Sequence, residues 1–222
     1  MKGVGDSFEY SLRDLQRAAM PNGVPLDAKR AQVARNVMEW ELNDIACIGR
    51  ASAGIQGFTN NDSVDVLTAA TVSSKTKWIT DTKAPAAIVA DLNALKRHPI
   101  VETKQIYSID TILLPSDLYE YAENTPWSDH DSKSILAVFR GNNPGITVEG
   151  WHALDLANAD GDGGRIIGYK RSPDVLEAMV PMEYTQIPAQ PKNLAFVVNA
   201  WALTGGTHIH RPKAVVYMDG AS

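Results

Sequence analysis

The chain of 222 residues contains only one cysteine, Cys47. An internal disulfide and a metal site made from several cysteines are therefore excluded. Cys47 falls within an apolar helical pattern, where a small thiol usually packs like a hydrophobic side chain. We expect it to be buried and unreactive rather than a catalytic nucleophile.

Long apolar runs are absent as well. No stretch approaches the roughly 20 apolar residues that a transmembrane helix needs. Residues 1–6 include a lysine but no apolar segment of the kind that follows the basic start of a secretory signal. The sequence thus predicts a protein without a membrane partner, synthesised in the cytoplasm.

Positive charge is not in excess either. The formal net charge is −5, from 21 Lys and Arg against 26 Asp and Glu, and no segment is dense in basic residues. A protein that grips nucleic acid through its phosphates needs a basic face that displaces counterions. Tight nucleic-acid binding is therefore not expected.

The composition is otherwise that of a soluble globular protein, with 44% hydrophobic and 21% charged residues. Helical patterns come first. Ser11 and Asp14 form a capping-box variant before a short helix that ends near residue 19. A helix of roughly 33 Å, capped by Asp27, is predicted over residues 27–48. Its apolar stripe is Ala31, Ala34, Met38, Leu42 and Ile45, and its polar face is Gln32, Asn36, Glu39 and Asn43.

The middle of the chain alternates between loops, helices and one buried strand. Residues 50–61, rich in Gly, Ala, Ser and Asn, are expected to form a loop. A second long helix is predicted over residues 82–98, because Pro85 is tolerated in a first turn and Pro99 should prevent continuation. The apolar run at residues 109–114 predicts a buried strand.

Two further helices are predicted from serine caps. Ser116 is expected to cap a short helix that ends near residue 121. Ser128 and Asp131 repeat the capping signature before another helix, which ends in the glycine- and asparagine-rich residues 141–145.

Strand patterns dominate the last third of the chain. Residues 146–151 and 165–170 are predicted to be strands on either side of a turn. Residues 194–203 and 207–218 are expected to pair as a hairpin across a Gly-Gly turn. The proline-rich residues 181–191 are expected to be extended and irregular. The fold class is therefore mixed α+β, with helices concentrated early and strands late.

The best candidate for a ligand site is the acidic turn between the strands predicted at residues 146–151 and 165–170. Asn158, Asp160 and Asp162 place oxygen atoms at alternate positions, as in the first half of an EF-hand calcium loop. The twelfth position of that loop is Tyr169 rather than the bidentate glutamate, and no helical pattern flanks it. These residues are therefore weak metal candidates, and a plain turn is favoured. A calcium-dependent binding module stays open as an alternative function.

The histidines offer the other candidates. His208 and His210 would face the same side of a strand, a spacing seen in metal sites, but no third ligand is close in sequence. Solvent-facing or interface histidines are favoured. Asp129, His130 and Asp131 fit a helix start, where acidic groups favour the positive end of the helix dipole. Hydrolase, Walker, dinucleotide-binding and kinase signatures are absent from the sequence. We therefore expect no catalytic residue, no cofactor and no resident metal.

Several segments resemble, in order and spacing, the major capsid proteins of tailed bacteriophages and prophages, whose fold is shared with encapsulins. Phe8-Glu9-Tyr10-Ser11-Leu12-Arg13-Asp14-Leu15 is similar to that family's first helix entry. Gly54-Ile55-Gln56-Gly57-Phe58-Thr59-Asn60 is similar to the loop after its long "spine" helix. The other segments are residues 26–31, 41–46, 111–115, 188–191 and 204–214.

The resemblance implies a fold and a division into domains. A peripheral domain would comprise residues 1–75, including the spine helix 27–48, and residues 186–222 would return to it as a β-hairpin. Residues 76–185 would form an axial domain, a mixed sheet with flanking helices, which clusters at ring centres. Family members usually carry an N-terminal arm and an extended loop before the spine, whereas only residues 1–10 precede the first predicted helix here.

The resemblance also implies a function without a catalytic site. The chain would be a structural subunit that self-assembles into pentamers and hexamers, contacts other capsid proteins, and encloses double-stranded DNA without binding it specifically. It would reside in the virion capsid after synthesis in the cytoplasm of a bacterial host. An encapsulin-type nanocompartment shell that encloses a cargo enzyme is the alternative on the same fold.

Overall fold

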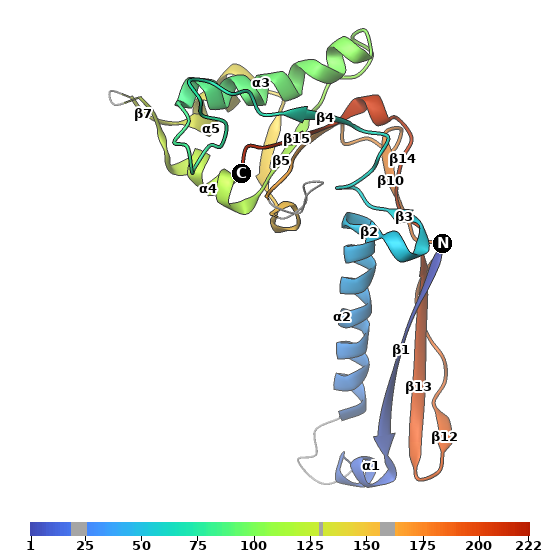
Figure 1. The fold of residues 1–222 in the computed structure, drawn as a ribbon. Coiled ribbons are helices and arrows are strands. Elements are labelled where there is room, and N and C mark those ends of the chain that lie inside the picture. Colours follow the sequence, from blue (N-terminus) through green and yellow to red (C-terminus); the bar gives the residue numbers. More distant parts are fainter. Residues whose placement is uncertain (19–25, 129–130, 156–162) are drawn as a thin grey trace. The chain divides into compact units, whose positions relative to one another are not determined.

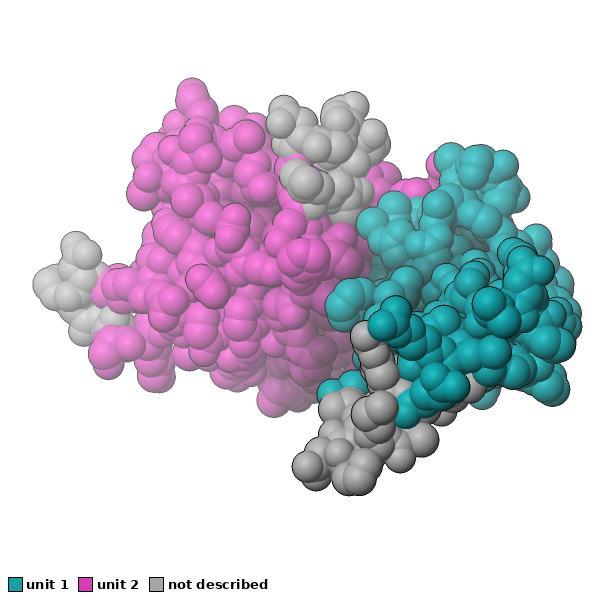
Figure 2. Space-filling view, turned by 90° about the horizontal axis from the view of Figure 1, so that it is seen from below, with its two compact units in different colours: residues 1–57, 178–208 teal, residues 58–177, 209–222 magenta. Residues whose placement is uncertain are grey.

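The computed structural model describes residues 1–18, 26–128, 131–155 and 163–222. The chain forms two compact units, which are coloured separately in Figure 2. Unit 1 comprises residues 1–57 and 178–208, and unit 2 comprises residues 58–177 and 209–222. Each unit is assembled from segments that are distant in the sequence, and the chain changes unit at other points than the expected boundaries after residues 75 and 185. Helices and strands are both abundant, as the mixed α+β class requires.

Unit 1 is built on a sheet whose central strand is β13 (Ala195–Thr204). β1 (Lys2–Ser11) pairs with it antiparallel from end to end, with side chains alternating between half-buried and exposed. No pattern in the sequence predicts this strand, because Lys2 and Asp6 interrupt its apolar positions. The long antiparallel pairing with β13 supplies the hydrogen bonds that make it a strand nonetheless.

The other side of β13 pairs with β11 (Met182–Gln186) and β12 (Gln190–Lys192). Residues 181–191 are thus more regular than expected. Pro191 lies within β12, where the strand is an edge of the sheet and a missing N–H donor is tolerated.

The helix predicted over residues 27–48 is α2 (Leu26–Cys47), which runs along β1 and β13 (Figure 1). Its predicted apolar stripe is buried or half-buried at all five positions, Ala31, Ala34, Met38, Leu42 and Ile45. Met38 forms a small core with Ala200 and Ala202 of β13. The predicted polar face is exposed, so both faces of this helix are confirmed.

The short helix α1 (Leu12–Ala18) begins at the predicted capping box. Ser11 Oγ accepts a hydrogen bond from the N–H of Asp14, and an Asp14 carboxylate oxygen accepts one from the N–H of Ser11, both at 3.2 Å. The two bonds are reciprocal, as a capping box requires, and the prediction is confirmed.

After α2 the chain folds back on itself, although an open loop is predicted at residues 50–61. β2 (Gly49–Arg50) pairs antiparallel with β3 (Ile55–Gln56). A Cβ at Gly57 would lie 2.3 Å from the carbonyl oxygen of Cys47, so only glycine fits at this close approach.

Unit 2 contains a five-stranded sheet in the order β4 (Asp65–Thr68), β15 (Val215–Asp219), β9 (Ile166–Tyr169), β5 (Thr111–Leu114) and β8 (Thr147–Gly150). The β4–β15 and β5–β8 pairs are parallel, and the pairs between β15, β9 and β5 are antiparallel. All of β5 is buried, as the apolar run at residues 109–114 predicts. β8 and β9 confirm the strands predicted at residues 146–151 and 165–170.

Both faces of this sheet are covered. One face packs against three helices, α3 (Pro85–Glu102), α4 (Ser116–Asn124) and α5 (Ile135–Asn142). Ile112 of β5 belongs to this helix-covered core, whereas the next residue, Leu113, belongs to a second core with Phe58 and Leu154. Alternate residues of one strand thus serve opposite cores.

The prediction that residues 194–203 and 207–218 pair as a hairpin is wrong. β13 pairs with β1, β11 and β12, while residues 207–218 are divided between β14 (Gly206–Ile209) and β15. Pro212 opens a 3-10 turn between those two strands, because proline cannot donate to a strand ladder. β14 pairs with β10 (Leu176–Met179). The chain passes from unit 2 into unit 1 within β10 and returns to unit 2 within β14.

Two predicted helix boundaries also differ. Pro99 lies inside α3 rather than ending it, and one more turn forms in which the N–H and hydroxyl of Thr103 donate to the Pro99 carbonyl at 3.0 and 2.6 Å. Ser116 is the first residue of α4 rather than its cap. Its N–H donates to Asp155 Oδ1 at 2.8 Å, so the acceptor comes from a distant segment.

The predicted cap at Ser128 is wrong as well. Ser134 caps α5, because its Oγ accepts a hydrogen bond from the N–H of Ala137 at 3.1 Å. Ser128 ends β6 (Pro126–Ser128), and Asp131 begins β7 (Asp131–Ser134), which pairs with it. Both serines suit a cap by residue type, and only the one next to the helix serves.

Truncation of Ile112 to alanine is expected to lower the free energy of unfolding by about 3 kcal/mol, because the fully buried side chain would leave a cavity. Ile106→Ala is the matched control. The Ile106 side chain is 73% exposed, so its loss should change stability by less than ~0.5 kcal/mol. Urea denaturation followed by circular dichroism measures both, and equal losses would contradict this core.

Candidate assembly surfaces

The weak calcium candidates Asn158, Asp160 and Asp162 lie outside the described residues, as do Asp129 and His130. The calcium interpretation therefore stays a prediction. Within the described part of the chain, no three His, Cys, Asp or Glu side chains come together as a metal site requires.

His208 and His210 do not share a strand, because β14 ends between them. Both are exposed, and His210 Nε2 lies 3.3 Å from a carboxylate oxygen of Glu177. Cys47 is buried, as predicted. Burial and the nearby charge of Asp44 raise the pKa of its thiol, so the reactive thiolate is disfavoured.

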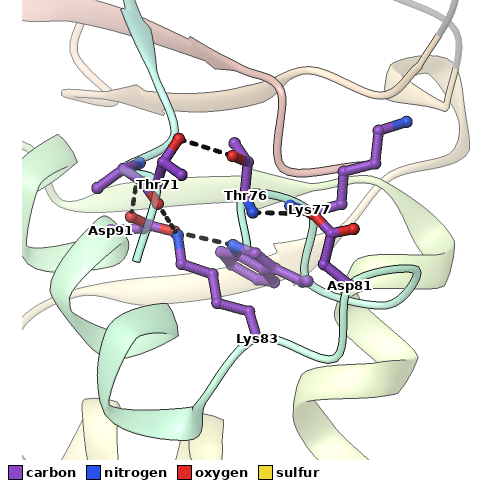
Figure 3. A network of polar contacts seen from close by, with 8 residues as sticks. Thr71, Thr76, Lys77, Asp81, Lys83 and Asp91 are labelled. Carbon is purple, nitrogen blue, oxygen red and sulfur yellow. Dashed lines mark hydrogen bonds and ion pairs between the residues drawn. The ribbon is translucent and has the colours of Figure 1, made fainter. Parts of the chain in front are cut away.

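A buried ion pair organises the segment before α3 (Figure 3). Lys83 Nζ lies 2.5 Å from Asp91 Oδ2 and donates to the Ala70 carbonyl oxygen at 2.6 Å. Trp78 Nε1 donates to the same Asp91 oxygen at 3.0 Å, and the N–H of Ala70 donates to Asp91 Oδ1 at 3.2 Å. Both charged side chains are 1% exposed. A charge is tolerated at this depth only when it is paired and hydrogen-bonded, so the network braces the fold.

A second buried cluster surrounds Arg165. Its guanidinium donates to both carboxylate oxygens of Asp219 at 2.8 and 2.6 Å and to the Thr59 carbonyl at 2.7 Å. The guanidinium carbon lies 4.7 Å from the ring centre of Tyr217. The Tyr217 hydroxyl donates to the Phe58 carbonyl at 2.5 Å, and burial raises the pKa of this tyrosine to about 12. The cluster ties the first residues of unit 2 to β9 and β15.

Neither cluster was singled out from the sequence, because each pairing depends on residues that only the fold brings together. Their polar groups are bonded within the fold, and none of their residues lines the surface hollows described below. These clusters therefore stabilise unit 2.

Unit 1 carries a groove of about 470 Å³ between α2 and the start of β1. Its lining includes Val4, Val37 and Trp40, together with the acidic Asp6, Glu41 and Asp44. Trp40 is 75% exposed and belongs, with Val33 and Val37, to a second apolar stripe along the outward face of α2. Clustered apolar groups in contact with water mark interaction sites.

The tip of unit 1 lies where the β12–β13 turn meets α1. The N–H of Leu12 donates to the Leu194 carbonyl at 3.1 Å, so the two residues are neighbours. Leu194 is 76% exposed, and Leu12 is exposed as well. Arg13, which follows Leu12, and Lys192, two residues before Leu194, are exposed cations.

In unit 2, the turn after α3 exposes Ile106. Lys104 and Gln105 before it have φ values of 52° and 67°, a conformation that costs of order 1 kcal/mol per residue outside glycine. The turn borders a hollow that is also lined by Tyr107 and Lys213. Backbone strain of this kind persists where the surrounding structure imposes it, and it often marks functional positions.

Sheet edges are further candidates for contact. Among the described strands, β1, β11 and β12 are edges of the main sheet in unit 1, and β4 and β8 are the edges of the five-stranded sheet in unit 2. Edge strands leave backbone N–H and C=O groups available to another chain.

Exposed apolar surfaces are what a building block requires, and comparison with known proteins agrees. A family model described as major capsid protein matches residues 1–221. The chain belongs to the major capsid protein family. No curated protein sequence matches it.

Solved capsids share its fold. Similarity to the capsid of Myoviridae Phage XM1 has a TM-score of 0.81 and 13% identity, over 99% of this chain and 73% of that chain. For the capsid of an empty GTA particle, the TM-score is 0.63 at 11% identity, and the match covers 99% of this chain and 73% of that chain. For a virus-like particle from Pyrococcus furiosus, it is 0.59 at 13% identity, with 98% and 76% covered.

The family and fold predictions are thus confirmed, and this major capsid protein is a structural subunit of a capsid shell. Family membership implies a non-enzymatic role and a place in the virion capsid. None of the described helices is both long and apolar enough to cross a bilayer.

Removing one partner of the buried ion pair should destabilise unit 2 more than removing both. Lys83→Met is expected to lower the free energy of unfolding by about 3–5 kcal/mol, because the Asp91 carboxylate would stay buried without a counter-charge. Adding Asp91→Leu should recover much of this loss. Lys213→Met removes an exposed ion pair with Glu102 and should cost less than ~1 kcal/mol. Urea denaturation compares the variants, and similar losses in the free energy of unfolding for the two single lysine variants would contradict the stabilising role of the buried ion pair.

Stability is expected to fall as the pH rises from about 10, the ordinary tyrosine pKa, to about 12, the pKa of folded Tyr217. The folded state holds the phenolic proton more tightly than the unfolded state. The stabilisation that comes from this tighter proton binding is therefore complete below the pKa of the unfolded state and is lost as the pH rises through the pKa of the folded state. Tyr217→Phe should flatten this part of the profile in denaturation experiments at stepped pH. An unchanged alkaline slope in the variant would contradict the assignment.

Proposed function

We propose that copies of this chain form pentameric and hexameric rings that close into a shell around double-stranded DNA. The observation that carries the proposal is the family match over residues 1–221. Head-to-tail contacts between identical subunits close into rings when their rotation closes. Exposed apolar groups on α2, at the tip of unit 1 and after α3 provide surfaces for such contacts.

In this proposal unit 1 is the peripheral domain and unit 2 is the axial domain at ring centres. The support is the location of α2, the counterpart of the spine helix, in unit 1 together with the sheet that it packs on. Most of residues 76–185, predicted to be axial, belong to unit 2.

The charge of the chain suits a container. With a net charge of −5, the wall would not hold phosphates tightly, so the DNA would be enclosed without specific binding. Other capsid proteins would be further partners, and synthesis would precede assembly in the cytoplasm of the bacterial host.

Assembly is directly testable with the purified full chain. Oligomers that grow with protein concentration are expected in sedimentation velocity, and rings with five- or six-fold symmetry are expected in negative-stain electron microscopy. A chain that sediments as a monomer at every soluble concentration would contradict self-assembly.

An encapsulin-type shell is the second candidate, because the fold is also similar to that of the virus-like particle from Pyrococcus furiosus. The TM-score of 0.59 is lower than the 0.81 for the phage XM1 capsid, which favours the phage shell. The content of particles isolated from producing cells separates the two. Packaged DNA supports the phage shell, whereas protein cargo without DNA supports the nanocompartment.

A further inference from the structure

We infer that the tip of unit 1 in one copy docks into the groove of unit 1 in a second copy. The inference rests on the proposed shell function, which supplies identical copies in close proximity. The "acidic groove" is Val4, Asp6, Val37, Trp40, Glu41 and Asp44. The "basic tip" is Leu12, Arg13, Lys192 and Leu194.

The two surfaces carry opposite charge. Glu41 already has an ion-pair partner, so Asp6 and Asp44 are the carboxylates that would meet an incoming cation. Arg13 and Lys192 are exposed and enter no ion pair within the described part of the chain. Complementary charge steers an encounter between surfaces and fixes its orientation.

The apolar groups match as well. Leu194 on the tip and Trp40 on the groove are about three-quarters exposed, at 76% and 75%. Docking would remove both from water, which is the main favourable contribution to association. A tryptophan flanked by smaller apolar groups, here Val4 and Val37, is a common anchor of protein interfaces.

A chain cannot fill its own groove with its own tip. The groove borders β1 at residues 4–6, whereas the tip begins where β1 ends, at Ser11. At about 3.3 Å per residue, the two are roughly 20 Å apart along one strand. β1 runs from the groove to the tip, where α1 begins, with α2 and β13 alongside it (Figure 1). The contact is therefore between copies, and it is head-to-tail because the two surfaces differ.

A charge exchange tests the contact in the full chain. Lys192→Glu and Asp44→Lys should each raise the concentration needed for assembly about tenfold, because each places like charges together. The double variant, which restores opposite charges across the contact, should assemble nearly as the unmodified chain does. Light scattering and sedimentation measure the assembly threshold, and circular dichroism checks that each variant is folded.

The matched control combines Lys192→Glu with Glu120→Lys, an exposed position on α4 in unit 2. It has the same net charge as the double exchange but adds no cation to the groove, so it should not rescue assembly. Single variants that assemble normally would overturn the docking inference, as would a double variant that stays impaired or a control that rescues equally. Failure of the unmodified chain to assemble would instead contradict the proposed function.

Discussion

Unit 1 depends on the close packing of α2 against β13. Met38 is buried there with Ala200 and Ala202, and Ala34, one turn earlier on the helix, is buried as well. The small alanines let the helix approach the sheet closely, and the flexible methionine fills the remaining space, as a core with few voids requires. A larger residue at Ala200 or Ala202 would separate helix and sheet. The same packing holds the tip and the groove at a constant distance.

The two units differ in how they bury their apolar side chains. Unit 2 has a core on each face of its sheet and two ionic clusters bonded within the fold. Unit 1 has a small core around Met38, and its Val33, Trp40 and Leu194 remain in water. Since a small core contributes little to stability, contact with a second copy would stabilise unit 1 more than unit 2.

Local signals in the sequence predicted the elements that need no distant partner. The apolar period of α2, the Ser11–Asp14 capping box and the apolar run of β5 are of this kind. β1 was not predicted, because its pairing with β13 outweighs the effect of the polar Lys2 and Asp6. The acceptor for the first N–H of α4 was not predicted either, because Asp155 lies in a segment far along the chain. One feature of the sequence could have indicated the groove. Val33, Val37 and Trp40 follow helical spacing and form a second stripe on a face that should be polar.

Contacts of modest strength suit a shell better than strong ones. An exposed ion pair contributes at most about 1 kcal/mol, and full burial of a leucine about 2 kcal/mol. One tip in one groove is therefore weak enough for a misplaced subunit to dissociate. In a closed ring every subunit contributes both a tip and a groove, so removing one copy breaks two contacts at once. Stability of the assembly then comes from closure, and the side chains at the contact need to be complementary in charge and shape rather than reactive.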